Sequence, residues 1–237
     1  MAHKELVRTI IGVIGNVISF GMFVSPTPTF VNIWKAKSVQ HFKPDPYLAT
    51  ILNCAMWVFY GLPIVKKDSI LVSTINGVGL VIEAIFVTLF IIHSNWQKRR
   101  KIFIFLAGEA AILAIVIVVA LTALHGSKRS LFVGVLCTIL NVGMYLSPLT
   151  VMGRVIKTKS VKYMPFWLSL ANFVNGAVWF SYAFLRFDPW LVIPNGLGTV
   201  GGLIQLILYA TYYGSTNWDE DGDENGKAKE VQLSSEA

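Results

Sequence analysis

Hydrophobic and polar residues form long separate blocks along this chain, and they do not alternate residue by residue. Seven apolar runs are separated by short basic or turn-forming stretches, and they cover residues 9–31, 47–65, 70–93, 102–124, 131–151, 163–185 and 190–213. A run of about 20 apolar residues spans the hydrocarbon core of a bilayer as a helix. The runs are too long for barrel strands and lack their alternation. We therefore predict an all-α membrane protein with seven transmembrane helices.

The composition agrees with this prediction. The chain is 54% hydrophobic and only 14% charged, whereas soluble domains carry about 25% charged residues. The first run is too long for a cleaved signal peptide and contains Asn16 and Pro26, so we expect it to remain as a helix. Cys54 and Cys137 lie inside predicted spans, where we expect buried apolar residues rather than a disulfide.

The distribution of Lys and Arg predicts the orientation of the chain. The first, third and fifth loops together with the C-terminal segment carry thirteen of these residues, and the opposite side carries seven. Because Lys and Arg accumulate on the cytoplasmic side, we expect an extracellular or lumenal N-terminus and a cytoplasmic C-terminus. The net charge of +7 combines −5 from Trp218 onward with +12 in the rest of the chain. We expect most of this positive charge beside anionic cytoplasmic lipid, and we expect no nucleic-acid partner. Residues 214–237 are polar and acidic, which predicts a disordered cytoplasmic tail.

The chain also repeats itself. Matched residues recur 122 positions later in the first two helices and 119 positions later in the third. The pairs are Gly21 and Gly143, Met22 and Met144, Ser25 and Ser147, Pro26 and Pro148, Asn53 and Asn175, Trp57 and Trp179, Tyr60 and Tyr182, and Asn76 and Asn195. We predict two parallel three-helix bundles, residues 9–93 and 131–213, which a linker helix within residues 94–130 joins in the same orientation.

The doubled motifs resemble those of the SWEET family of sugar transporters. The resemblance covers nearly all of residues 9–213 and is carried by "NCAMWVFYGLP", "STINGVG", "GMYLSP", "FVNGAVWFSYA" and "PNGLG" in order. It implies facilitative uniport of sugars by alternating access, at the plasma membrane, by a homo-oligomer such as a trimer. It also implies a transporter that is not an enzyme and needs no cofactor or metal. Accordingly, the four histidines lie outside the spans or at their ends, without cysteines at metal-ligand spacing.

The resemblance also assigns a sugar site. Asn76 and Asn195 lie inside spans, where a carboxamide offers donors and acceptors to sugar hydroxyls. Trp57 and Trp179 lie near the middle of their spans, where an indole ring can pack on the apolar face of a sugar. The remaining residues expected to line the pocket are Met22, Met144, Ser19 and Asn141. The bulk of the two methionines favours monosaccharides over disaccharides.

The resemblance assigns gates on both sides of the site. Four prolines in two pairs, Pro26 with Pro148 and Pro46 with Pro165, are expected to kink helices and act as hinges of an inner gate. Tyr60, Tyr182 and Asp188 are expected to form an outer gate. The remaining intramembrane asparagines, and Glu83, are expected to hydrogen-bond between helices.

Two other functions stay open at this point. A proton-coupled exporter of another small solute shares the doubled fold, although its Pro-Gln pair is replaced here by Ser25-Pro26-Thr27 and Ser147-Pro148-Leu149. A seven-helix receptor also places its N-terminus outside. Receptors have no internal repeat, however, and the chain lacks their Asp-Arg-Tyr and Asn-Pro-x-x-Tyr signatures.

Overall fold

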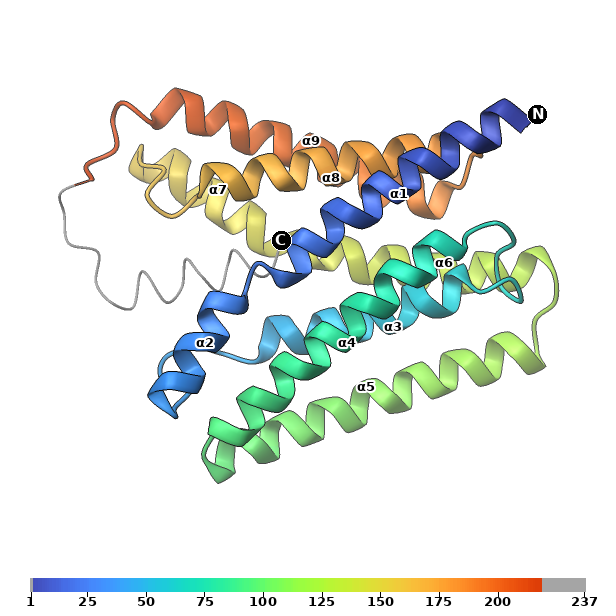
Figure 1. Cartoon of the computed structure of the whole chain (residues 1–237), viewed down its shortest axis with the longest axis horizontal. Helices are drawn as coiled ribbons and strands as arrows, with labels where there is room; N and C mark the ends of the chain where they lie inside the picture. Colours follow the sequence, from blue (N-terminus) through green and yellow to red (C-terminus); the bar gives the residue numbers. More distant parts are fainter. Residues whose placement is uncertain (1, 219–237) are drawn as a thin grey trace. The chain divides into compact units, whose positions relative to one another are not determined.

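A computed structural model describes residues 2–218 of the chain, which form nine α-helices within that range (Figure 1). The helices are α1 (Ala2–Val24), α2 (Thr27–Ala36), α3 (Asp45–Gly61), α4 (Ile70–His93), α5 (Trp96–Thr122), α6 (Ser127–Met144), α7 (Leu146–Thr158), α8 (Phe166–Leu185) and α9 (Pro189–Tyr212). The pairs α1–α2 and α6–α7 are each one predicted run broken in two, so the described chain has the seven expected helical segments. The disordered tail predicted for residues 214–237 lies largely outside the described residues.

The first helix of each repeat is broken where the sequence predicted only a proline kink. α1 ends at Val24 and α2 begins at Thr27, with Pro26 as the residue that precedes the new helix. α6 ends at Met144, Tyr145 precedes α7, and Pro148 lies in the first turn of α7. A proline at a helix start needs no amide hydrogen, so each break fits its proline without an unsatisfied acceptor in the helix interior.

The other two prolines differ from the prediction in the same way. Pro46 lies in the first turn of α3, and Pro165 directly precedes α8. Neither position interrupts a helical hydrogen bond, because the first-turn amides of a helix have no partner within the helix. These residues therefore begin helices rather than kink them.

The repeat is visible in backbone conformation as well as in sequence. Lys37 directly follows α2 and Lys159 directly follows α7, and both adopt left-handed dihedral angles, with φ of 51° and 54°. Only a few per cent of residues other than glycine have a positive φ. Two such residues 122 positions apart indicate that the same local structure was built twice.

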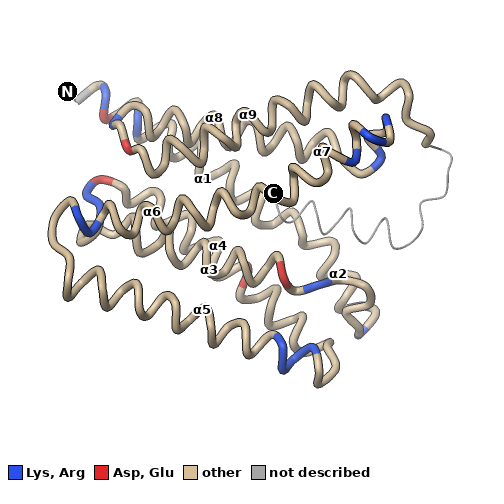
Figure 2. The backbone as a smooth tube through the Cα atoms, turned by 180° about the vertical axis from the view of Figure 1, so that it is seen from behind, with Lys and Arg blue, Asp and Glu red and all other residues tan. Residues whose placement is uncertain are grey.

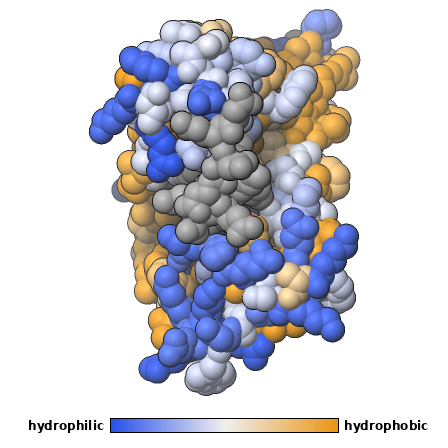
Figure 3. All heavy atoms as spheres, turned by 90° about the vertical axis from the view of Figure 1, so that its left-hand side faces the viewer, coloured by the Kyte–Doolittle hydropathy of each residue, from blue (hydrophilic) through white to orange (hydrophobic). Residues whose placement is uncertain are grey.

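The helices have the length and surface of membrane-spanning segments. Six stretches among the described residues are long and apolar enough to cross a membrane, and α3, with 17 residues, is shorter. Charged residues gather at helix ends and are sparse along helix middles (Figure 2). Large hydrophobic side chains lie exposed along the helices, Val17, Val81 and Ile115 among them, and hydrophobic residues appear at the sides of the view in Figure 3. A multi-pass membrane protein follows from these features.

The described helices pack into two compact units, each of which we treat separately. Within the described residues, the α8–α9 unit contains residues 2–22 and 141–218, and the α3–α4 unit contains residues 23–140. These units are defined by packing, whereas the expected domains, residues 9–93, 94–130, 131–213 and 214–237, are defined by the repeat. The latter division stays a prediction.

Small residues allow close helix packing within each unit. In the α8–α9 unit, a Cβ on Gly202 would lie 2.7 Å from backbone atoms of Phe173. In the α3–α4 unit, a Cβ on Gly61 would lie 2.8 Å from the Ser69 carbonyl oxygen, and Ser73 Oγ donates to the Val58 carbonyl at 2.8 Å. Helices in membranes associate mainly through such close contacts and hydrogen bonds, because lipid gives no hydrophobic drive between them.

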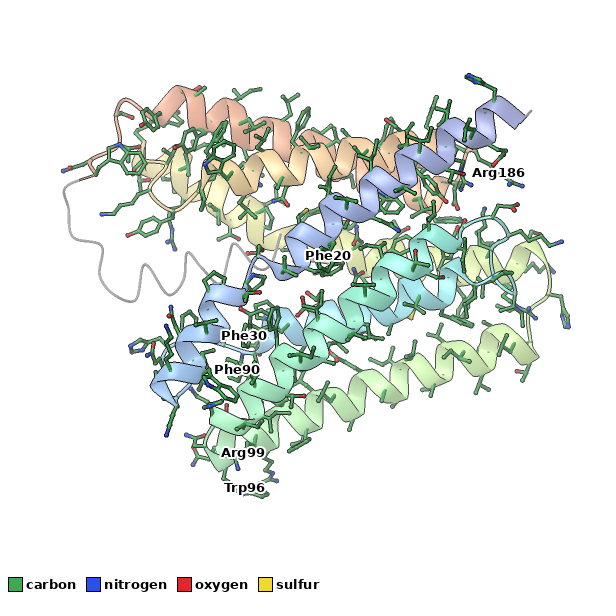
Figure 4. All side chains as sticks on the ribbon, in the orientation of Figure 1. Phe20, Phe30, Phe90, Trp96, Arg99 and Arg186 are labelled. Carbon is green, nitrogen blue, oxygen red and sulfur yellow. The ribbon has the colours of Figure 1, made fainter. Side chains whose placement is uncertain are left out.

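An aromatic cluster and a basic turn complete the α3–α4 unit. Phe30 of α2 stacks on Phe86 of α4 at 4.2 Å between ring centroids. At the α4–α5 turn, Arg99 Nε donates to the Ile91 carbonyl at 2.8 Å and so satisfies the end of α4 (Figure 4). Lys101 forms an ion pair with Asp45 at 3.2 Å. Cys54 and Cys137 are buried and free of disulfides, as the sequence predicts.

Candidate functional site

The predicted sugar-binding asparagines occupy equivalent positions with the same side-chain conformation. Asn76 Nδ2 donates to the Val72 carbonyl at 2.9 Å, one turn earlier in α4. Asn195 Nδ2 donates to the Leu191 carbonyl at 2.8 Å, one turn earlier in α9. A carboxamide has two N–H donors and one carbonyl acceptor. The shared contact uses one donor and leaves each amide the capacity to bind a further partner.

The predicted tryptophans are matched in the same way. Trp57 packs edge-on against Tyr60 at 5.4 Å in α3, and Trp179 packs edge-on against Tyr182 at 5.2 Å in α8. Both indoles are largely buried, at 5% and 6% exposure. Edge-to-face packing fixes the ring planes, so each unit presents one oriented tryptophan beside one tyrosine.

Ser19 joins α1 to α8 through a short hydrogen-bond chain. Trp179 Nε1 donates to Ser19 Oγ at 3.0 Å, and Ser19 Oγ donates to Asn175 Oδ1 at 2.7 Å. Asn175 thus makes an interhelical hydrogen bond, which is the role expected for it from the sequence. A serine hydroxyl has one hydrogen, which Asn175 receives here, so Ser19 can offer a sugar only an acceptor lone pair.

The residues expected to set pocket size lie next to the two helix breaks. Met22 is close to the end of α1, and Met144 is the last residue of α6. Both side chains are half-buried. Asn141 lies one turn before Tyr145, and a side-chain hydrogen bond joins the two residues.

Two of the three expected outer-gate residues lie together in the α8–α9 unit, with an unpredicted arginine. The guanidinium of Arg8 lies 4.0 Å above the ring of Tyr182, and Arg8 is only 6% exposed. Asp188 is buried and caps α9 by accepting from the Trp190 amide at 3.3 Å. Arg186 approaches Glu5 at 3.9 Å beside the start of α1 (Figure 4). Tyr60 belongs to the other unit.

Sequence reasoning missed two glycines and the aromatic residues that cover them. Phe23 lies against Gly79 in the α3–α4 unit, and Tyr145 lies against Gly198 in the α8–α9 unit. Each glycine follows a candidate sugar-binding asparagine by three residues. The sequence signal that could have indicated this contact is the aromatic residue after methionine in both copies of the doubled motif, Phe23 after Met22 and Tyr145 after Met144.

Glu83 is the buried acid of the α3–α4 unit. It is 3% exposed, and its Oε2 makes no hydrogen bond within residues 2–218. No group of three or more His, Cys, Asp or Glu residues that could hold a metal occurs in the same range.

These features define a multi-pass helical transporter built from two copies of one unit of structure. Residues 9–98 and 131–217 match the family described as "Sugar efflux transporter for intercellular exchange", MtN3_slv. The chain therefore belongs to the SWEET family of bidirectional sugar transporters, and its members are facilitators rather than enzymes.

Three curated relatives illustrate the similarity. The chain is 57% identical to the bidirectional sugar transporter SWEET5 of Arabidopsis thaliana, over 96% of this chain and 95% of that protein. It is 53% identical to SWEET7b of Oryza sativa subsp. indica, over 93% and 84%. It is 53% identical to SWEET4 of Arabidopsis thaliana, over 93% and 88%.

A solved structure agrees with the fold. The chain aligns with a eukaryotic SWEET transporter with a TM-score of 0.86 and 37% sequence identity, over 89% of this chain and 99% of that chain. The resemblance stated from the sequence is thereby confirmed for the family and for the seven-helix fold.

Proposed function

We propose that this protein is a uniporter that carries monosaccharides such as glucose down their gradient by alternating access. The observation that carries the proposal is the matched geometry of Asn76 and Asn195. After the Nδ2 hydrogen bond to its own helix, each side chain keeps one N–H and its Oδ1 for a further hydrogen bond. Sugars carry hydroxyl groups that both donate and accept, so a pair of amides of this kind suits them. The names of the relatives support a sugar as the substrate.

The other candidate residues have complementary roles in this proposal. Trp57 and Trp179 pack on the apolar face of the sugar, and their tyrosine neighbours hold the rings in place. Ser19 and Asn141 add polar contacts. Met22 and Met144 limit the size of the sugar, because methionine is bulky and adapts its shape to what it contacts. This limit favours a monosaccharide over a disaccharide.

The gates and the assembly are also part of the proposal. Pro26 and Pro148 act as hinges at the helix breaks, and Pro46 and Pro165 act where α3 and α8 begin. Tyr60, Tyr182 and Asp188 close the outer side. The protein works in the plasma membrane as a homo-oligomer, with its N-terminus outside.

Radiolabelled sugar flux into proteoliposomes tests this proposal. We expect glucose flux well above that of sucrose and unchanged between an outside pH of 5.5 and 7.5, in contrast to a proton-coupled exporter. Loss of a matched amide should remove about 1–3 kcal/mol from sugar binding. Asn76→Ala and Asn195→Ala should therefore each lower glucose flux by about tenfold or more at equal protein amounts.

The matched control is Ser181→Ala, which removes an exposed hydroxyl that bonds only to the Ala177 carbonyl of its own helix. Near-normal glucose flux in both asparagine variants contradicts the assigned site. A flux that follows the proton gradient contradicts uniport.

A further inference from the structure

An aromatic side chain covers a glycine one turn from each candidate sugar-binding asparagine. In the α3–α4 unit, a Cβ on Gly79 would overlap the Cζ of Phe23 and would lie 2.7 Å from its Cε1 and Cε2. In the α8–α9 unit, a Cβ on Gly198 would lie 2.6 Å from the hydroxyl oxygen of Tyr145 and 3.3 Å from its Cζ. A methyl group at either place would require the aromatic side chain to move.

Gly79 and Gly198 are the two glycines of α4 and α9 at which a Cβ would lie within 3.0 Å of the outer end of an aromatic side chain, whereas a Cβ on Gly202 would instead meet the backbone of Phe173. A Cβ on Gly77 of α4 or on Gly201 of α9 would have no heavy atom of a neighbouring element within 4 Å. Phe23 and Tyr145 are equivalent in the repeat, as are Gly79 and Gly198. We call the aromatic side chain of Phe23 or Tyr145 the knob, and the surface of the glycine that it covers, Gly79 or Gly198, the notch. The same knob therefore fills the same notch in both units.

The knob lies where the first helix of its repeat breaks. Phe23 is followed by the α1–α2 break, and Tyr145 is itself the residue between α6 and α7. A broken helix lacks the continuous hydrogen bonds that keep its two parts in register. The aromatic contact supplies a fixed point for the break, on the helix that carries the asparagine.

The two contacts differ by one oxygen atom. The Tyr145 hydroxyl donates to the Pro194 carbonyl at 2.8 Å, directly before Asn195 in α9, and is also hydrogen-bonded with Asn141. Phe23 has no hydroxyl, and its ring carbons are the atoms nearest to a Cβ on Gly79. The closest atom to the notch is thus an oxygen in one unit and a ring carbon in the other.

We propose that Phe23 and Tyr145 are positioning residues for sugar binding, each of which fixes the broken first helix of its repeat against the helix that holds Asn76 or Asn195. This inference rests on the proposed function, because it assumes that the asparagines contact the sugar. A methyl group at Gly79 or Gly198 displaces the knob and moves the adjacent asparagine. The Michaelis constant for glucose then rises while the maximal flux changes less.

The one-atom difference gives a distinctive test in the α8–α9 unit. Gly198→Ala should raise the KM for glucose by about tenfold, since a displacement of about 1 Å in a site can cost up to 10²-fold. Tyr145→Phe removes only the hydroxyl that the new methyl group would meet. The double variant Gly198→Ala with Tyr145→Phe should therefore return to the KM of Tyr145→Phe alone.

The α3–α4 unit needs a different rescue. Gly79→Ala should raise the KM similarly, and Phe23→Leu should restore it in the double variant, because leucine lacks the three ring carbons that meet the notch. The exchanged pairs, Gly79→Ala with Tyr145→Phe and Gly198→Ala with Phe23→Leu, should stay defective. Gly201→Ala serves as the matched control in α9 and should leave the KM unchanged.

Flux in proteoliposomes, protein amount and thermal unfolding in detergent are measured for every variant. Wild-type protein that moves no glucose overturns the proposed function together with this inference. Active wild-type protein with no rescue in either double variant overturns this inference alone. Should an alanine variant be absent from the membrane, Phe23→Leu and Tyr145→Leu decide, because they only remove atoms, and an unchanged KM in both overturns the inference.

Discussion

The Ser19 hydroxyl links two other side chains in a cluster that the repeat alone does not predict. Ser19 is separated by 156 positions from Asn175 and by 160 from Trp179, yet it bonds to both. The chain of bonds orders the indole of Trp179 and the amide of Asn175 at once. Because all three groups are in or near the proposed sugar site, their orientation before the sugar arrives affects binding.

Removal of this hydroxyl should weaken both the fold and the site. Ser19→Ala leaves the indole N–H of Trp179 and the carbonyl oxygen of Asn175 without these partners. Interhelical hydrogen bonds in membranes contribute about 0.6 kcal/mol each on average and up to about 1.7. We expect a loss of about 1–2 kcal/mol in unfolding free energy, measured by chemical denaturation in detergent, and a higher KM for glucose.

Ser19→Thr is the matched variant, since it retains a hydroxyl at the same position. It should remain closer to wild type than Ser19→Ala in both measurements. Equal behaviour of the two variants would mean that the hydroxyl has no such role.

Most of the residues that the sequence predicted occur twice. The repeat spacing paired Asn76 with Asn195 and Trp57 with Trp179, the family resemblance assigned them to a sugar site, and the structure gives each pair one shared conformation. Arg8 has no basic counterpart in the second repeat, where Ser130 stands. Its position over Tyr182 at 4.0 Å depends on how α1 packs against α8, and local sequence carries no information on that packing.

At the scale of helices, glycine decides how closely two neighbours approach. Gly201 and Gly202 are adjacent in α9 but face different surroundings. A Cβ at Gly202 would meet the backbone of Phe173 in α8 at 2.7 Å, whereas a Cβ at Gly201 would meet no neighbouring element within 4 Å. Backbone atoms cannot turn aside as a side chain can, so the two positions should respond differently to the same substitution.

Gly202→Ala should separate α8 from α9 and destabilise the protein by about 1–3 kcal/mol, as overpacking of a close contact does. Gly201→Ala should be neutral or should stabilise α9 by up to about 1 kcal/mol, because alanine favours helix over glycine. The midpoint of thermal unfolding in detergent measures both effects. Similar midpoints for the two variants would contradict the close packing of α8 on α9.

Helix number and approximate position followed from the apolar runs, but the helix breaks did not. Hydropathy stays high through residues 9–31 and 131–151, and the breaks after Val24 and Met144 leave no trace in it. Proline in a sequence is compatible with a kink, a break or a helix start. The structure distinguishes these cases by where the next helix begins.

At the scale of the whole molecule, the repeat and the packing units divide the chain differently. The chain passes between units after Met22 and after Leu140, which are close to the two helix breaks. In both copies, the doubled Gly-Met-aromatic-x-Ser-Pro motif therefore lies at or next to the point where the chain leaves one packing unit and enters the other. A sequence repeat reveals that a segment was duplicated, but it does not reveal which segments pack together.

The charge distribution along the whole chain predicts its orientation, and two exposed loop residues can test it. Gln97 is exposed at the start of α5, in a loop expected to be cytoplasmic, and His125 is exposed in the next loop, expected outside. Cys54 and Cys137, the two cysteines of the chain, are both buried at 0% exposure, so background labelling by a thiol reagent should be low.

We expect a membrane-impermeant maleimide to label His125→Cys in intact cells and Gln97→Cys only after permeabilisation. The physical reason is that thirteen Lys and Arg residues on one side and seven on the other favour retention of the richer side in the cytoplasm. The reverse labelling pattern would show that the chain inserts in the opposite sense, and the proposed outer gate at Tyr182 and Asp188 would then face the cytoplasm.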